Sequence, residues 1–136
     1  MGYDAALPIE VPSADPSKRY AIPFHVADDV ENAKDRIRQV KLLLSINNLM
    51  SADRLTVLLN GKSLASQTCL RDFNDHVAPY RGQLLELYLK DVRPHKGKNV
   101  LEISLDERPA GMAGGVSIEH VELLVKYGSY PSALSG

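Results

Sequence analysis

Two segments of alternating apolar residues, each next to a glycine-containing turn, constrain the fold of this chain most strongly. The first covers residues 54–64 and contains Asn60-Gly61, a dipeptide suited to a tight hairpin because both residues can adopt positive φ. In the second, residues 96–105, Leu101, Ile103 and Leu105 alternate with Val100, Glu102 and Ser104 after a turn centred on Gly97. Two such segments separated by a long loop predict an all-β antiparallel sandwich.

The same two-residue period predicts the remaining strands. They cover residues 7–11, 20–26, 40–47, 85–89 and 116–127, and a change of phase near Glu119-His120 predicts a β-bulge or corner in the last one. A capping-box spacing from Asp28 to Glu31 predicts one short helix over about residues 29–36. The predicted core contains Leu42, Leu44, Val57, Leu87, Leu101, Ile103 and Leu123.

Size and charge limit the kind of protein that this chain can be. Its 136 residues predict a single domain over 1–136, with a core at about 7–127 and flexible ends at 1–6 and 128–136. A net charge of −1 gives no general attraction to nucleic acid. The sequence contains no apolar window of about 18 residues, so it predicts no membrane span. The single cysteine, Cys69, excludes an internal disulfide and is predicted to be buried or half-buried.

Motifs for catalysis or for a cofactor are absent from the sequence. It contains no phosphate-binding loop, no dinucleotide-binding motif, no nucleophile elbow and no paired-histidine metal motif. We therefore predict no cofactor and no catalytic residue. A structural calcium ion is an alternative, because carboxylates are the oxygen ligands that calcium prefers. Its candidate ligands are Asp28, Asp29, Glu31 and Asp106.

A long polar segment is the strongest candidate for a ligand site. Residues 66–82 are predicted to be irregular, and loops of this length in a compact domain are usually functional or disordered. Carboxylate and guanidinium groups can hydrogen-bond vicinal hydroxyls, and a tyrosine can stack on a sugar ring. The candidate ligand-binding residues are Arg71, Asp72, Asp75, His76, Tyr80 and Arg81. A loop that only covers the end of the sandwich is an equal alternative. A basic segment from Lys90 to Lys98 is a weaker candidate, for an acidic ligand.

The order of these segments resembles a known family. "ADRLTVLLNGKSL", "GKNVLEISL" and "VSIEHVELLVKY" are similar to segments of the galactose-binding-like, jelly-roll accessory domains of bacterial glycoside hydrolases. The resemblance implies a non-catalytic carbohydrate-binding module of a polysaccharide-active enzyme. Its implied partners are a poly- or oligosaccharide and the catalytic domain of the parent enzyme. The chain has no Trp, so stacking would depend on tyrosines such as Tyr80 and Tyr88.

Two other functions stay open at this point. Pro- and Ser-rich segments at 12–18 and 130–136 favour a domain excised from a longer protein, and an extracellular one. Such a domain could pack against a catalytic domain without binding sugar, which predicts an exposed apolar patch. A sugar-binding domain predicts a polar groove with an exposed tyrosine. A small enzyme, the third possibility, predicts titratable residues that converge in a pocket.

Overall fold

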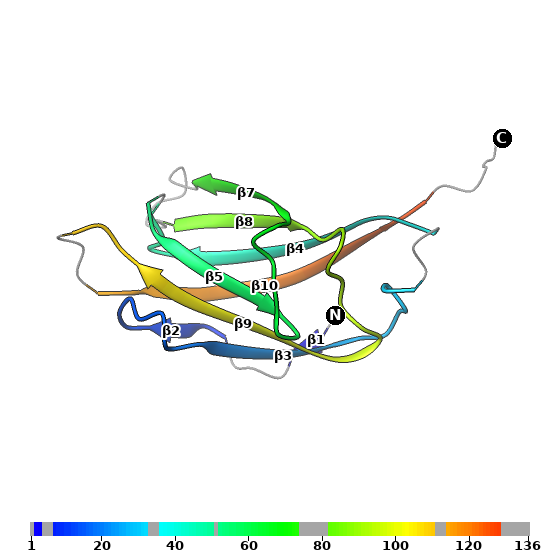
Figure 1. Ribbon diagram of the computed structural model, residues 1–136, viewed down its shortest axis with the longest axis horizontal. Helices are drawn as coiled ribbons and strands as arrows, with labels where there is room; N and C mark the ends of the chain where they lie inside the picture. The colour runs from blue at the N-terminus through cyan, green and yellow to red at the C-terminus, as the bar shows by residue number, and fades with distance from the viewer. Residues whose placement is uncertain are drawn as a thin grey trace.

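The chain folds into two antiparallel sheets that pack face to face (Figure 1). The computed structural model describes residues 2–3, 7–32, 36–50, 52–73, 82–110 and 114–128, with residues 2, 3, 72, 73 and 82 in their backbone only. Sheet A contains, in spatial order, β1 (Gly2–Tyr3), β3 (Tyr20–Val26), β9 (Gly97–Glu107), β5 (Arg54–Leu59) and β6 (Lys62–Ser63). Sheet B contains β2 (Ile9–Val11), β10 (Val116–Tyr127), β4 (Ile37–Asn47), β8 (Gly82–Tyr88) and β7 (Thr68–Phe73).

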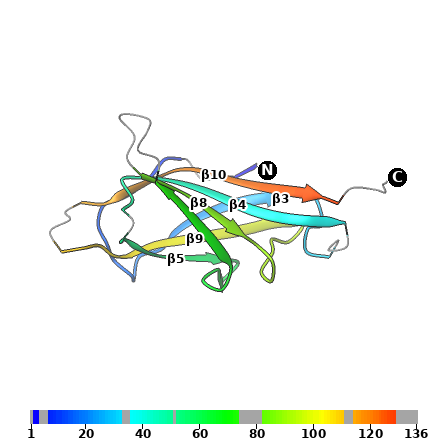
Figure 2. The ribbon, with the colours of Figure 1, turned by 90° about the horizontal axis from the view of Figure 1, so that it is seen from above.

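The strand order confirms the predicted antiparallel sandwich and has the form of a jelly roll. Among the eight strands of three residues or more, sheet B begins with the first, eighth, third and sixth, and sheet A holds the second, seventh and fourth. The place of the fifth strand is divided between the two sheets. The two-residue strand β6 pairs with the end of β5, and the chain then crosses to sheet B as β7 (Figure 2). The described residues therefore provide no strand beside residues 54–57 of β5 on that side.

The core lies between the sheets and consists of the inward-facing residues that the two-residue period predicts. Five of the seven predicted core residues are buried: Leu42, Leu44, Leu87, Leu101 and Ile103. The other two, Val57 and Leu123, are half-buried and pack against the cluster. Burial of aliphatic side chains contributes about 1.5–3 kcal/mol each relative to exposure, so this cluster is the main source of stability.

Two predicted features of the backbone, a hairpin turn and a β-bulge, are confirmed. Asn60 and Gly61 have φ of 52° and 82° and connect β5 to β6 as a tight hairpin. The pairing of β10 with β4 shifts register between Ile118 and His120, which is the predicted β-bulge. The bulge leaves Glu119 without a partner in that ladder.

The predicted short helix is wrong. Residues 30–32 and 36 form turns, and the described part of the chain contains no helix. The Asp29 carboxylate does accept a hydrogen bond from the amide of Asn32 (3.2 Å), but the capping contact closes a turn only. A segment this short has too few backbone hydrogen bonds to hold a helix by itself.

Residues 66–82 are also more regular than predicted. Residues 68–73 form β7, which pairs with β8 along its whole length, so a strand replaces the first half of the expected irregular loop. Cys69 lies on this outer strand and is exposed, which corrects the prediction of a buried or half-buried side chain. Pairing with a distant strand overrides the polar composition of this segment.

Candidate functional site

Arg71, the first candidate ligand-binding residue, holds the β4–β5 connection against sheet B. Its Nε donates to Gln83 Oε1 (2.7 Å), Nη1 to the carbonyl oxygen of Asp53 (3.1 Å) and Nη2 to that of Met50 (2.8 Å). Each nitrogen of the half-buried guanidinium group thus donates to the protein itself. Arg71 therefore has a structural role that the sequence did not indicate.

The other candidate residues lie at the limit of the described structure or beyond it. The backbone of Asp72 pairs with Leu84 in sheet B, and its side chain is not among the described ones. The remaining four, which lie outside the described residues, are Asp75, His76, Tyr80 and Arg81. Gly82, where the chain resumes, pairs with Asn47 at the end of β4. β8 therefore begins at the end of the sandwich where β4 ends.

A buried ion pair connects the loops at that end, which is the left end of Figure 1. The side chains of Arg108 and Asp53 are 3% and 0% exposed, and two guanidinium nitrogens reach the two carboxylate oxygens at 3.1 Å. Arg108 also donates to the carbonyl oxygens of Asn48 (2.9 Å) and Gly115 (3.0 Å). A bidentate, fully hydrogen-bonded pair fixes geometry strongly. The β4–β5 and β9–β10 connections therefore form one rigid unit.

A polar groove of about 450 Å³ opens beside this rigid unit. This volume lies in the usual range for small-molecule sites. The strands β2, β4 and β10 supply its walls, and its polar side chains come from Glu10, Asn47, Asn48, Ser117 and Glu119. Three of them stand side by side in the sheet, because Ser117 pairs with Glu10 on one side and with Asn47 on the other. We call this cavity the polar groove.

The floor of the polar groove depends on a close approach of two backbones. A Cβ atom at Gly115 would lie 1.5 Å from the carbonyl oxygen of Val11, so only glycine fits there. The Gly115 carbonyl oxygen accepts a hydrogen bond from Asn48 Nδ2 (2.9 Å) in addition to the bond from Arg108. Asn48 itself has a φ of 66°, a conformation that asparagine tolerates better than most residues. The floor is thus fixed from β2, β4 and β10 together.

The groove presents acceptors and carries negative charge. The half-buried Glu119 lies at the bulge, where its carboxylate accepts a hydrogen bond from the Ser117 hydroxyl. The Glu10 side chain is exposed and makes no hydrogen bond or ion pair with the described residues. Neither Lys nor Arg is among the described lining residues. Arg108 lies behind the floor, where Asp53 neutralises it. The arrangement suits a ligand with several hydroxyl donors better than an anion.

Tyr88, a further candidate for stacking, already has a partner on its ring. The Lys41 ammonium lies 5.5 Å from the ring centroid and donates to Glu86 Oε1 at 3.1 Å. The hydrogen bond to Glu86 raises the pKa of Lys41 above its usual range. All three side chains lie on the outer face of sheet B, and this contact occupies one face of the tyrosine ring.

The weaker candidates from the sequence do not form sites within the described structure. Asp106 accepts hydrogen bonds from Thr56 and Ser104 near the end of β9, whereas Asp28, Asp29 and Glu31 follow β3, which pairs with the start of β9. An eleven-residue strand spans about 35 Å, so Asp106 cannot meet the other three calcium candidates. The described residues contain no group of three His, Cys, Asp or Glu that could hold a metal ion. In the basic segment, His95 contacts Glu31 at 3.0 Å.

Comparisons with models of known protein families, with curated proteins and with solved structures found no match. None of the described segments forms a helix with the length and apolar character that a membrane crossing requires.

Proposed function

We propose that this chain is a non-catalytic carbohydrate-binding module that serves as an accessory domain of a polysaccharide-active enzyme. The polar groove is the observation that carries the proposal. It combines carboxylate, amide and hydroxyl side chains on three adjacent strands with a floor that the Arg108–Asp53 pair holds in place. Sugar hydroxyls need such acceptors and donors at fixed positions, and a rigid site loses little entropy on binding.

The charge of the groove narrows the expected ligand to uncharged sugars. Glu10 and Glu119 would repel a uronate, and Arg71, one of the two arginines among the candidate ligand-binding residues, donates to protein acceptors instead. We expect a soluble or short neutral oligosaccharide, bound in the groove. Stacking on Tyr80 stays a prediction.

Calorimetric titration tests this function. The folded chain is titrated with neutral hexasaccharides (cellohexaose, xylohexaose and mannohexaose) and with the acidic hexagalacturonate. Glu119→Gln and Asn47→Ala should each weaken binding of the best neutral ligand roughly 10-fold, since a hydrogen bond contributes about 0.5–1.5 kcal/mol, and one to a charged group such as Glu119 about 1.5–3 kcal/mol. Glu122→Gln is the matched control on the same strand, because Glu122 contacts His120 and does not line the groove.

The alternative is a structural domain that packs on a catalytic domain and binds no sugar. Its support would be a large exposed apolar patch. The exposed large apolar side chains of the described residues are Leu70, Leu124 and Tyr127, and the charged Lys41–Glu86 pair lies between the first two on sheet B. If no oligosaccharide binds, this alternative replaces the proposal.

A further inference from the structure

Sheet B ends in an unusually long outer strand. The six residues of β7 pair with β8 on one side, and the described residues provide no strand on the other. The three other outer strands, β1, β2 and β6, are only two or three residues long, and residues 119–127 of β10, beyond the part that pairs with β2, form a further open edge among the described residues, one that contains Lys126. An outer strand presents a row of unpaired backbone donors and acceptors, which proteins usually limit by keeping such strands short or by placing Lys or Pro in them. β7 has neither residue; its charged residues are Asp72 and Arg71, whose guanidinium group donates to the protein itself.

The same edge exposes apolar surface. Leu70, near the middle of β7, is 48% exposed, the largest value among the large apolar residues of the described chain. Beside it, Cys69 lies at the rim of a groove of about 280 Å³ between β7 and sheet A. Most of that groove is apolar, with Leu55, Val57, Leu64, Leu85 and Leu87 in its walls. The groove opens where the described residues provide no strand beside residues 54–57 of β5 on one side.

We propose that β7 pairs with β7 of a second copy of this chain, antiparallel, across a two-fold axis at Leu70. A two-fold axis perpendicular to the sheet joins the two sheets B into one and keeps inner faces on the same side. Inward-facing residues then lie opposite inward-facing ones. The added strand would also cover the mouth of the apolar groove.

Charge and apolar contact together select the register. If Arg71 were at the axis, it would face Arg71 of the second copy, and directly opposed like charges destabilise an antiparallel pair. With Leu70 at the axis, the two leucines face each other, and Arg71 lies opposite Cys69 of the second copy. Thr68 then lies opposite Asp72 of the second copy. This register pairs the exposed apolar side chains and keeps the charges apart.

The size of the contact predicts a weak dimer. Two six-residue strands bury less than the roughly 1,200 Å² of typical stable complexes, which places this interface in the transient class. We expect a dissociation constant on the order of 100 µM, which corresponds to a binding free energy of about 5–6 kcal/mol. Sedimentation velocity should therefore show a monomer at about 5 µM and mostly dimer at about 500 µM.

Two leucines on the same face of sheet B give a matched pair of variants. Leu70→Lys should remain monomeric at the highest concentration, because it adds a charge at the axis. Leu124→Lys should dimerise as the wild type does, since Leu124 is 39% exposed on β10, which is separated from β7 by β4 and β8. A wild type that is monomeric throughout would overturn the proposal and leave the edge to a strand of another protein. Equal loss of dimer in both variants would also overturn it.

Disulfide trapping tests the register itself. In the Cys69→Ser background, Leu70→Cys should form a covalent dimer under mild oxidation, because directly opposed residues have Cβ atoms about 4.5–5.5 Å apart. Leu124→Cys in the same background should stay monomeric. If Leu124→Cys cross-links as readily as Leu70→Cys, the contact is random and the register is wrong.

Discussion

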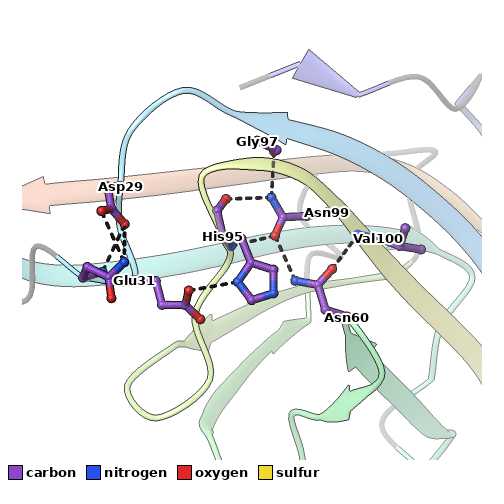
Figure 3. A network of polar contacts seen from close by, with 8 residues as sticks. Asp29, Glu31, Asn60, His95, Gly97, Asn99 and Val100 are labelled. Carbon is purple, nitrogen blue, oxygen red and sulfur yellow. Dashed lines mark hydrogen bonds and ion pairs between the residues drawn. The ribbon is translucent and has the colours of Figure 1, made fainter.

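The side-chain amide of Asn60 donates to Asn99 Oδ1 at 2.9 Å, so the hairpin turn between β5 and β6 is bonded to the start of β9 (Figure 3). Asn99 is 1% exposed, and its Oδ1 also accepts from the amide of His95 (2.7 Å). Its Nδ2 donates to the carbonyl oxygens of His95 (2.9 Å) and Gly97 (3.0 Å). Asn60 Oδ1 in turn accepts from the amide of Val100 (2.9 Å).

This contact predicts that Asn99→Ala is strongly destabilising. The variant leaves the amide of His95 and the carbonyl oxygens of His95 and Gly97 without their partner. An unsatisfied group that stays buried costs about 1–3 kcal/mol, but water reaches part of these groups because His95 is exposed and Gly97 is half-buried. We expect a loss of about 2–4 kcal/mol in a urea titration. A double-mutant cycle with Asn60→Ala should show a coupling of about 0.5–3 kcal/mol. Additive losses would mean that the two side chains do not depend on each other.

The Arg108–Asp53 pair should be much more important for stability than an exposed pair of the same type. Asp53→Asn leaves the buried guanidinium group uncompensated, which typically costs about 3–5 kcal/mol. The matched control is Glu107→Gln, because the Arg54–Glu107 pair is 77% and 69% exposed and should contribute at most about 1 kcal/mol. Denaturant unfolding of both variants measures the difference. Similar losses would contradict a buried, rigid unit below the polar groove.

Cys69 should react slowly with alkylating reagents at neutral pH. Although the residue is exposed on the edge strand, atoms around the apolar groove desolvate the thiol and raise its pKa, and the nearby Arg71 opposes this only in part. A raised pKa keeps the thiol protonated, and the thiolate is the reactive form. The pH profile of iodoacetamide alkylation, measured at low micromolar protein, should therefore rise at higher pH than that of a short cysteine peptide. A coincident profile would refute the desolvation.

The sequence predicts the parts of this fold that depend on local chemistry. The two-residue period placed the inward faces of β4, β8 and β9, and Asn60-Gly61 marked the hairpin, because burial and φ preference act within a few residues. The bulge near Glu119 was visible for the same reason. The predicted helix does not form, because a capping contact alone does not stabilise so short a helix when no other element packs against it.

The contacts that build the candidate site join residues that lie far apart in the sequence. Arg71 reaches Met50 across 21 residues and Arg108 reaches Asp53 across 55, and no local pattern marks either pair. The polar groove likewise takes single residues from three strands, such as Glu10, Asn47 and Ser117. Only the strand order brings them together. A polar segment with few apolar residues also concealed β7, whose strand character comes from pairing with β8.

The most direct test of the proposed function is to map the ligand site by NMR. The backbone amides are recorded while the strongest-binding of the three neutral hexasaccharides is added. We predict that the amides of Asn48, Gly115 and Ser117 shift in the polar groove, while those of Gly97 and Asn99, at the opposite end of the sandwich, stay in place. Shifts confined to that opposite end or to the face around Tyr88 would contradict the assignment of the groove. An absence of shifts with all three hexasaccharides would contradict carbohydrate binding itself.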